Sequence, residues 1–192
     1  MQTDQRISLA MAELMRRQGY AATGIKQVIE AAGVPNGSLY HHFPGGKSEI
    51  AGVALRTMGA AYAELVGGLL ADGDDLPAAI EQAFASAATD IESIGWVNMC
   101  PVGTIAGEVA EAEPALREVV ADIFTSWIDE GVELVVRRGY RADDARELVT
   151  ALVAALEGAF VMARTLRSGE PLRGAGRAMA AYASTLPVGV RR

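Results

Sequence analysis

The stretch from Gly19 to Ile50 constrains this chain most, because its apolar and turn-forming residues fit two short helices joined by a sharp turn. The first of these helices has apolar residues at the i, i+3, i+4, i+7 spacing of an amphipathic helix, namely Ile25, Val28, Ile29 and Ala32. Gly33 follows directly, and a glycine there can take the left-handed conformation that ends a helix. Pro35 then stands at the favoured first position of a new helix.

The second helix is short and has only Leu39 and Phe43, four residues apart, for burial. Its other side chains are small or able to form hydrogen bonds: Asn36, Ser38, Tyr40, His41 and His42. Two short helices that cross over a glycine-containing turn form a helix-turn-helix. The sequence therefore predicts that the second helix enters the major groove of DNA.

Four strings carry a closer resemblance: Gly19-Tyr20, Ala31-Ala32-Gly33-Val34, Leu39-Tyr40-His41-His42-Phe43, and Lys47 at the start of the next helix. Together they resemble the DNA-binding domain of TetR/AcrR-type transcriptional regulators. The DNA contacts that we expect come from Thr23, Gly24, Lys26, Pro35, Asn36, Gly37, Ser38, Tyr40, His41, His42 and Lys47. The resemblance implies that Tyr40, His41 and His42 touch phosphates.

The chain departs from this family at two positions. Gly24 stands where a Ser or Thr usually caps the helix, and glycine is only a slightly poorer cap. Asn36 stands where a Lys is frequent, and an asparagine can pair with N6 and N7 of adenine. We therefore expect Asn36 to read a base where a lysine would bind phosphate.

Two other interpretations of this region are rejected. Gly46-Lys47-Ser48 is no nucleotide-binding loop, because the glycine required five residues before Gly46 is His41 and no strand precedes it. We interpret Lys47 as a contact to the DNA backbone, with a solvated charge as the alternative. Neighbouring His41 and His42 point about 100° apart on a helix and have no third histidine to join them, so we expect no metal.

The composition favours closely packed helices, since hydrophobic residues make up 51% of the 192 residues but aromatic residues only 6%. The net charge is −7, yet residues 1–50 carry five Lys/Arg against four Asp/Glu. An acidic protein of this kind can still bind DNA, because phosphate contacts depend on local cations. A single cysteine, Cys100, excludes an intrachain disulfide and a thiolate zinc cage.

The termini and apolar stretches indicate a cytoplasmic protein without a membrane segment. Asp4 and Glu13 interrupt the first apolar stripe, which argues against a signal peptide. The apolar stretch from Leu148 to Ala163 contains Glu157 and is shorter than the roughly 20 residues of a membrane span. We also expect no cofactor.

The sequence predicts an all-α protein: an N-terminal three-helix helix-turn-helix domain and a C-terminal helical bundle for ligand binding and dimerisation. The domains would be 1–46 and 47–187, with a frayed tail at 188–192. Outside the helix pair, the expected helices lie near 4–18, 47–69, 76–94, 114–139, 143–166 and 170–185, and 95–103 is expected to break the pattern.

A cluster of aromatic, apolar and sulfur-containing side chains flanks that break, where a bundle can leave an apolar pocket. Its members are Phe84, Ile91, Trp96, Met99, Cys100, Ile105, Phe124, Trp127 and Met162, with Glu157 as the acidic member. Ordinary core packing remains the alternative for each. The strings Met99–Thr104 and Ala154–Ala159 resemble the branch of lincomycin-resistance repressors, which implies a drug-like or aromatic effector.

Small residues form a seam on the last two helices: Ala151, Ala154, Ala155, Gly158, Ala159, Ala163, Gly174, Ala175, Ala178 and Ala181. Such a seam suits a four-helix homodimer interface or tight packing within one subunit. We predict a dimeric repressor that a small-molecule effector releases from an inverted-repeat operator in double-stranded DNA. The alternatives are a helical interaction module or scaffold, and a small helical enzyme, for which the sequence offers no nucleophile–base pair.

Overall fold

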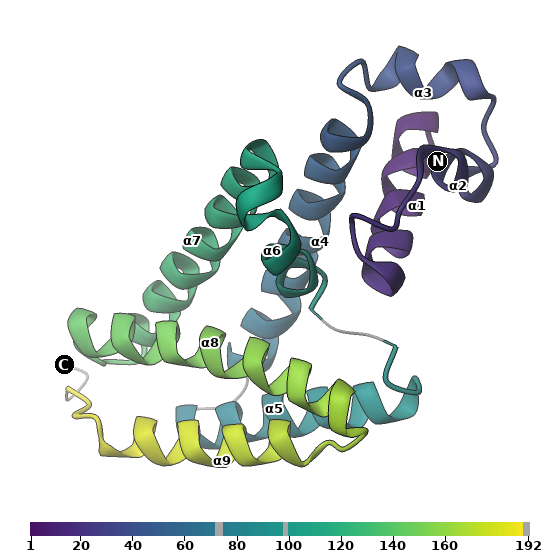
Figure 1. Ribbon diagram of the computed structural model, residues 1–192. Coiled ribbons are helices and arrows are strands. Elements are labelled where there is room, and N and C mark those ends of the chain that lie inside the picture. The colour runs from purple at the N-terminus through teal and green to yellow at the C-terminus, as the bar shows by residue number, and fades with distance from the viewer. Residues whose placement is uncertain (72–74, 98–99, 190–192) are drawn as a thin grey trace. The chain divides into compact units, whose positions relative to one another are not determined.

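The computed structural model describes residues 1–71, 75–97 and 100–189, with the side chains of 71 and 101 excepted. This part of the chain forms nine helices (Figure 1): α1 (Thr3–Gln18), α2 (Ile25–Ala32), α3 (Asn36–His42), α4 (Gly46–Ala71), α5 (Leu76–Ser93), α6 (Pro101–Ala112), α7 (Pro114–Arg137), α8 (Ala142–Leu166) and α9 (Glu170–Thr185). No strand occurs in these residues, and Tyr140 and Val188 form one isolated antiparallel bridge. The prediction of an all-α fold is confirmed.

The helices group into two compact units. One comprises Met1–Ala61 and Cys100–Ile123, and the other Tyr62–Met99 and Phe124–Arg192. The first unit thus contains α1, α2, α3, the first part of α4, α6 and the start of α7. The second contains α5, α8 and α9 with the remaining parts of α4 and α7.

The core of the first unit is aliphatic and sulfur-rich. Its fully buried large side chains include Ile7, Met11, Met15, Leu39, Ile50 and Leu55. These residues come from α1, α3 and α4, so the helix-turn-helix rests on α1 and on the first turns of α4. The first helix ends as predicted, because Gly19 follows it with a φ of 82°.

Helix α6 corrects the sequence-based prediction, which placed a break at 95–103 and assigned no helix between residues 94 and 114. Cys100 caps this helix with its Sγ atom, which accepts from the Gly103 amide at 3.5 Å. One face buries Val102, Ile105 and Val109, at positions i, i+3 and i+7. The pattern was missed because Gly103 and Gly107 lower the helix propensity between these apolar residues.

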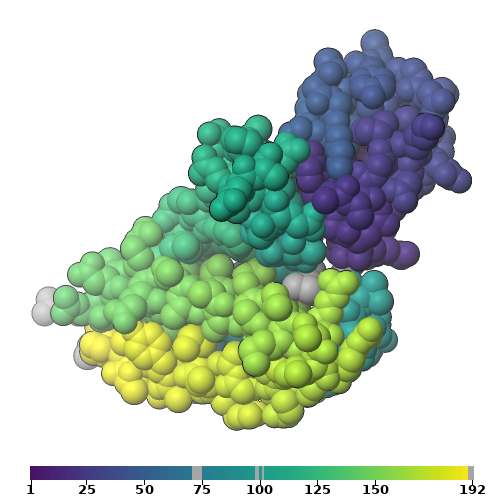
Figure 2. All heavy atoms as spheres, viewed as in Figure 1, coloured from purple at the N-terminus to yellow at the C-terminus, as the bar shows by residue number. Residues whose placement is uncertain are grey.

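In the second unit, α9 packs against α5 and α8, and α8 and α9 lie side by side on the surface in Figure 2. The approach of α9 to α5 is close, because a Cβ atom added at Gly176 would lie 2.6 Å from Phe84 Cβ. At one end, Arg173 donates from both terminal nitrogens to the Glu92 carboxylate, at 2.9 and 2.8 Å.

In the predicted tail 188–192, Val188 pairs with Tyr140 and the Gly189 amide donates to Gly139 O at 2.9 Å. Residues 190–192 lie outside the described part. In the residues that the structure describes, α8 is the one helix long and apolar enough to cross a membrane. Only 33% of its most apolar window is buried, which leaves an apolar face open.

Candidate nucleic-acid interface

The turn between α2 and α3 is built on Gly33. Its φ of 61° and ψ of 42° are left-handed, as predicted, and its amide donates to the carbonyls of Glu30 and Ile29. Arg6, on α1, donates from Nη2 to the Gly33 carbonyl at 2.9 Å. Both the amide and the carbonyl of Gly33 are therefore hydrogen-bonded, which fixes the direction in which α3 follows the turn. Pro35 is the N-cap of α3, one position before the one expected.

Helix α3 buries Leu39 and Phe43, as predicted, and exposes the opposite face. The exposed side chains include those expected to meet DNA: Pro35, Asn36, Gly37, Tyr40, His41 and His42, with Ser38 half-buried. Tyr40 is 59% exposed, unusual for an aromatic residue in a small domain. The rings of His41 and His42 meet edge to face, with centroids 5.1 Å apart. This face is thus polar and free of large aliphatic side chains.

The beginning of α2 differs from the expectation at Thr23. Its side chain is fully buried, and its hydroxyl donates to Gly19 O at 2.6 Å. A hydroxyl in that position holds the α1–α2 turn and does not face solvent, so this geometry gives Thr23 no phosphate contact. Sequence alone did not distinguish the two roles of a threonine before a helix, which can cap the helix or bond backward.

Gly24 is the exposed N-cap of α2 and has no side chain to accept from the first-turn amides. The Gln27 Oε1 atom accepts from the Gly24 amide at 2.9 Å, the reciprocal bond of a capping box. Gln18 in turn donates to Gln27 Oε1 at 3.1 Å. Lys26 is exposed in the first turn of the same helix, so its ammonium group is available to an anion.

Lys47 lies at the start of α4, half-buried rather than extended into solvent. Its Nζ atom is 4.1 Å from the centroid of the Tyr20 ring, a cation–π distance. The same atom donates a long hydrogen bond to Ala21 O, at 3.5 Å. The ammonium group is thus fixed beside the Tyr20-Ala21 pair.

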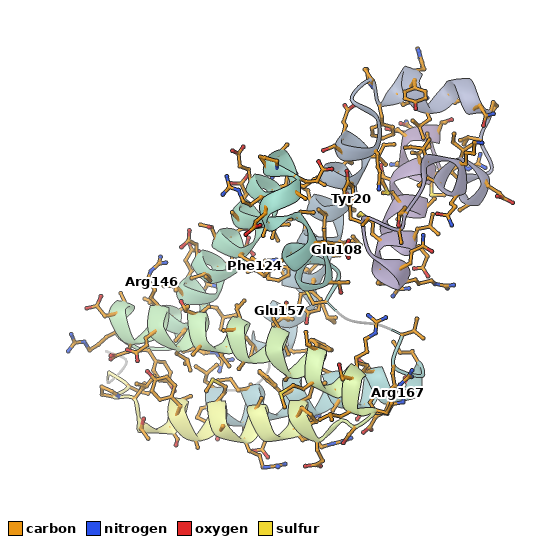
Figure 3. The ribbon with its side chains drawn as sticks, viewed as in Figure 1. Tyr20, Glu108, Phe124, Arg146, Glu157 and Arg167 are labelled. Atoms are coloured by element: carbon orange, nitrogen blue, oxygen red, sulfur yellow. The ribbon has the colours of Figure 1, made fainter. Side chains whose placement is uncertain are left out.

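The carboxylates of Glu108 and Glu113 accept hydrogen bonds from this pair; Figure 3 labels Tyr20 and Glu108. The Tyr20 hydroxyl donates to Glu113 Oε1 at 3.3 Å, and the Ala21 amide donates to Glu108 Oε2 at 2.9 Å. Burial, followed by the charge of Glu113 and the hydrogen bond to it, raises the pKa of Tyr20 to about 12. Tyr20 is therefore a protonated donor throughout the physiological range.

Sequence reasoning missed Glu108 and Glu113. They lie 87 and 93 residues from their partners, so no local spacing connects them. The one available signal was Gly19 before Tyr20. A Cβ atom at Gly19 would meet the Glu108 carboxylate in its present position, in addition to the strain of the positive φ.

The expected effector-binding residues are divided between the two units. Cys100 and Ile105 are buried in the first unit, and Met99 lies outside the described residues. In the second unit Phe84 and Ile91 are buried on α5, with Phe84 against Gly176, which is core packing. Met162 is exposed on α8, Glu157 is half-buried on the same helix, and Trp96 has a positive φ of 68° just after α5.

Phe124 and Trp127 are the two expected residues that do meet. Their ring centroids are 5.5 Å apart on α7, and Tyr62 on α4 lies 5.3 Å from Trp127. All three rings are half-buried. Tyr62 was missed in the sequence because it falls in a long alanine-rich helix without other aromatic residues. These three rings form a partly open aromatic cluster.

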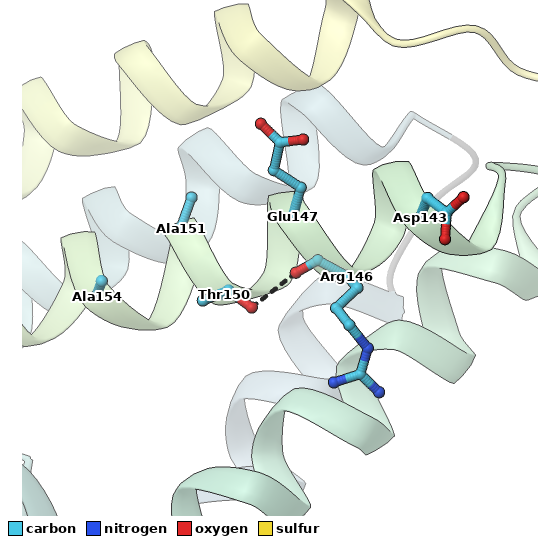
Figure 4. A pocket seen from close by; sticks show the side chains of 6 residues that line it. All are labelled: Asp143, Arg146, Glu147, Thr150, Ala151 and Ala154. Atoms are coloured by element: carbon cyan, nitrogen blue, oxygen red, sulfur yellow. Dashed lines mark hydrogen bonds between the residues drawn. The ribbon is translucent and has the colours of Figure 1, made fainter.

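The outer face of α8 is apolar toward one end and hollowed toward the other. Val161, Met162 and Leu166 are all at least half exposed. Figure 4 shows an open hollow along the other end, lined entirely by α8 residues: Asp143, Arg146, Glu147, Thr150, Ala151 and Ala154. Within the small-residue seam, Ala159 and Ala163 are buried inside the subunit, whereas Ala154, Gly158, Ala178 and Ala181 are exposed.

Comparisons with protein families match two parts of the chain. Residues 9–52 match the model described as bacterial regulatory proteins, tetR family. Residues 77–178 match the model of the C-terminal domain of LmrA/YxaF-like transcriptional regulators. The first match contains the helix-turn-helix, and the second contains Glu108, Glu113 and Trp127.

Individual relatives agree with these matches. The chain is 30% identical to an uncharacterised helix-turn-helix regulator, YxaF, of Bacillus subtilis, over 88% of each chain. It is 31% identical to the transcriptional regulator LmrA of the same species, over 88% of this chain and 89% of that one. A solved TetR regulator from Chloroflexus aurantiacus superposes with a TM-score of 0.79 at 28% identity, over 97% of both chains.

Proposed function

This chain belongs to the TetR family of DNA-binding transcriptional regulators, and from that premise we propose that it is a homodimeric, cytoplasmic repressor released from an inverted-repeat operator by a small, mostly apolar effector. Regulators of this family are not enzymes. The observation that supports the proposal most strongly is the exposed face of α3, which is held in place by the buried Leu39 and Phe43 and by the Arg6–Gly33 bond.

That face carries the chemistry of groove recognition. Asn36 is exposed at the start of α3, where the side chains of a recognition helix reach base edges. Tyr40, His41, His42 and Lys26 would donate to phosphates around it. Their contribution is local, so the net charge of −7 does not oppose it.

Dimerisation is supported by the outer face of α8 and α9. Exposed apolar side chains beside exposed small residues allow two helices of a partner to approach closely. A twofold axis through this face would give two recognition helices, which read two half-sites. The apolar surface that qualifies α8 by composition as a membrane span would then be covered by protein.

Effector binding is supported by the aromatic cluster of Tyr62, Phe124 and Trp127. A flat molecule stacked there would favour one arrangement of α4 and α7, and a ligand shifts an equilibrium only by its differential affinity for the two states. A relative from Mycobacterium that is 24% identical over 83% of this chain is named a transcriptional repressor, which favours repression here.

The proposal is tested by selecting duplexes from a random library with the purified protein and then repeating the binding with a panel of aromatic compounds. We expect an inverted repeat whose half-site centres lie about 10 base pairs or a multiple apart. An active compound should change Trp127 fluorescence and weaken binding by roughly 5- to 150-fold, the usual range of allosteric coupling. If the protein retains no duplex, the alternative is a helical interaction module. Repression itself is measured by transcription from a promoter that contains the selected site.

A further inference from the structure

The half-buried ammonium group of Lys47 has a defined position before any DNA is present. It lies over the Tyr20 ring at 4.1 Å and within 3.5 Å of Ala21 O. A free lysine side chain loses conformational entropy when it is immobilised. Contacts that already restrict Lys47 therefore lower the cost of placing it against a phosphate.

Both groups that restrict Lys47 are themselves restrained by carboxylates. The Tyr20 hydroxyl donates to Glu113, the C-cap residue of α6, at 3.3 Å. The Ala21 amide donates to Glu108, on α6, at 2.9 Å. Each carboxylate thus acts on one of the two groups that hold the ammonium.

The peptide around this pair has little freedom to move away. Gly19 has a φ of 82°, which strains any residue with a side chain, and a Cβ atom there would meet the Glu108 carboxylate in its present position. The buried hydroxyl of Thr23 bonds back to Gly19 O at 2.6 Å. The segment from Gly19 to Thr23 is therefore a fixed connection between α6 and Lys47.

We infer that Glu108 and Glu113 are positioning residues for the DNA-phosphate contact of Lys47, acting through the Ala21 amide and the Tyr20 hydroxyl. The inference rests on the proposed DNA-binding function. It gives acidic residues, which would repel DNA by their charge, a supporting role in binding it. Any movement of α6 moves both carboxylates and so changes the support of Lys47.

An effect of the two carboxylates through their charge and an effect through their hydrogen bonds predict opposite changes in DNA affinity, which makes the inference testable. If the two carboxylates acted only by their charge, removing either would strengthen DNA binding, and Ala and Gln would be equivalent. If they act by accepting hydrogen bonds, Ala weakens binding, whereas Gln retains an oxygen acceptor and preserves it.

The experiment measures binding of the full chain to duplex DNA of random sequence, at several salt concentrations, for Glu108→Ala, Glu113→Ala and Tyr20→Phe. Each change is made both in the natural background and in Lys47→Ala. In the natural background, we expect each change to weaken binding about three- to tenfold. In the Lys47→Ala background we expect less than about twofold, because the effects of coupled residues are not additive. Glu108→Gln and Glu113→Gln should remain within about twofold of the parent or bind more tightly.

Glu111→Ala is the matched control, because it removes the same charge from an exposed position of α6 that takes part in none of these bonds. It should not weaken binding. Thermal unfolding of every variant shows which are folded, and Tyr20→Phe, which removes the donor to Glu113 without changing the charge, tests the inference if an Ala variant is not.

The outcomes separate the inference from the function on which it rests. Equal losses in both backgrounds, or tighter binding by the Ala variants, would overturn the positioning role while leaving DNA binding intact. If Lys47→Ala keeps both the parent affinity and the parent salt slope, the phosphate contact itself is wrong, and the positioning role with it. Failure of the parent protein to bind any duplex would refute the proposed function.

Discussion

Arg6 Nη2 lies 2.9 Å from the carbonyl oxygen of Gly33, so a side chain of the first helix caps the end of the second at the turn of the helix-turn-helix. The bond joins residues 27 positions apart and ties α1 to the turn that precedes α3. It also explains why α1 is needed in a domain whose DNA-facing residues belong to other helices.

Replacing Arg6 with Ala should reduce the free energy of unfolding by about 1 kcal/mol, the usual contribution of one hydrogen bond. It should also weaken binding to all duplexes, since α3 would be less well oriented. Urea unfolding and duplex titration measure the two effects. Arg17→Ala is the control, because it removes an equal charge from the same helix, and Arg17 pairs with Glu13 and with no other acidic residue in the described part of the chain. Equal effects of the two variants would show that charge, not the Gly33 bond, is responsible.

Alanine substitutions at Gly33 and Gly37 should change the free energy of unfolding in opposite directions. Gly33→Ala places a Cβ atom on a left-handed residue, 2.9 Å from Arg6 Nη2, and should cost about 1–2 kcal/mol or more. Gly37 is helical with open space around it, so Gly37→Ala should stabilise the fold by up to about 1 kcal/mol. Urea midpoints that shift in the same direction for both would contradict this account.

Asn36→Lys should change the base preference of the protein, because an exposed asparagine can recognise adenine and a lysine favours guanine or phosphate. Selection from a random duplex library with each protein gives the answer. We expect loss of an adenine preference at one position in each half-site. Identical selected motifs would assign Asn36 to the phosphates or to solvent.

Met162→Glu should disrupt the proposed homodimer. The side chain is 54% exposed on the apolar face of α8, and an unpaired charge buried there by a partner would be costly. Sedimentation velocity should show monomers at concentrations at which the parent is dimeric. Leu9→Glu on α1 makes the same kind of change at a residue that is 50% exposed, and it should leave the dimer unchanged. A dimeric Met162→Glu protein would place the interface elsewhere.

The Glu92–Arg173 pair should contribute stability that depends on pH. Hydrogen bonds from Arg173 hold the pKa of Glu92 below its usual value of 4.5 in the folded chain. The folded state therefore favours the ionised carboxylate, so the contribution is present above pH 4.5 and is lost as the pH falls through the lowered pKa.

The thermal midpoint of Glu92→Gln should accordingly lie below that of the parent at neutral pH, and this difference should shrink as the pH falls below 4.5. Glu81→Gln, at an exposed position of the same helix, removes the same charge without an arginine partner. A Glu92→Gln difference that stays constant across that pH range would exclude the linkage.

The sequence alone determined the helix-turn-helix, because its signals are local. A stripe at helical spacing, a left-handed glycine after it, and two apolar residues four apart on the next helix each act within a few residues of one another. The exposed face of α3 follows from these signals, since Leu39 and Phe43 can be buried in only one orientation. The family followed from the same residues.

Tertiary structure alone decided which side chains support that face and which do not. Thr23 became buried because its hydroxyl bonded backward to Gly19, and Lys47 gained its position from Tyr20 and Ala21. Glu108 and Glu113 act across about 90 residues of chain, on a helix too glycine-rich to be recognised by its spacing. Local spacing specifies a helix and its faces, but partners distant in sequence meet only when the packed core brings them together.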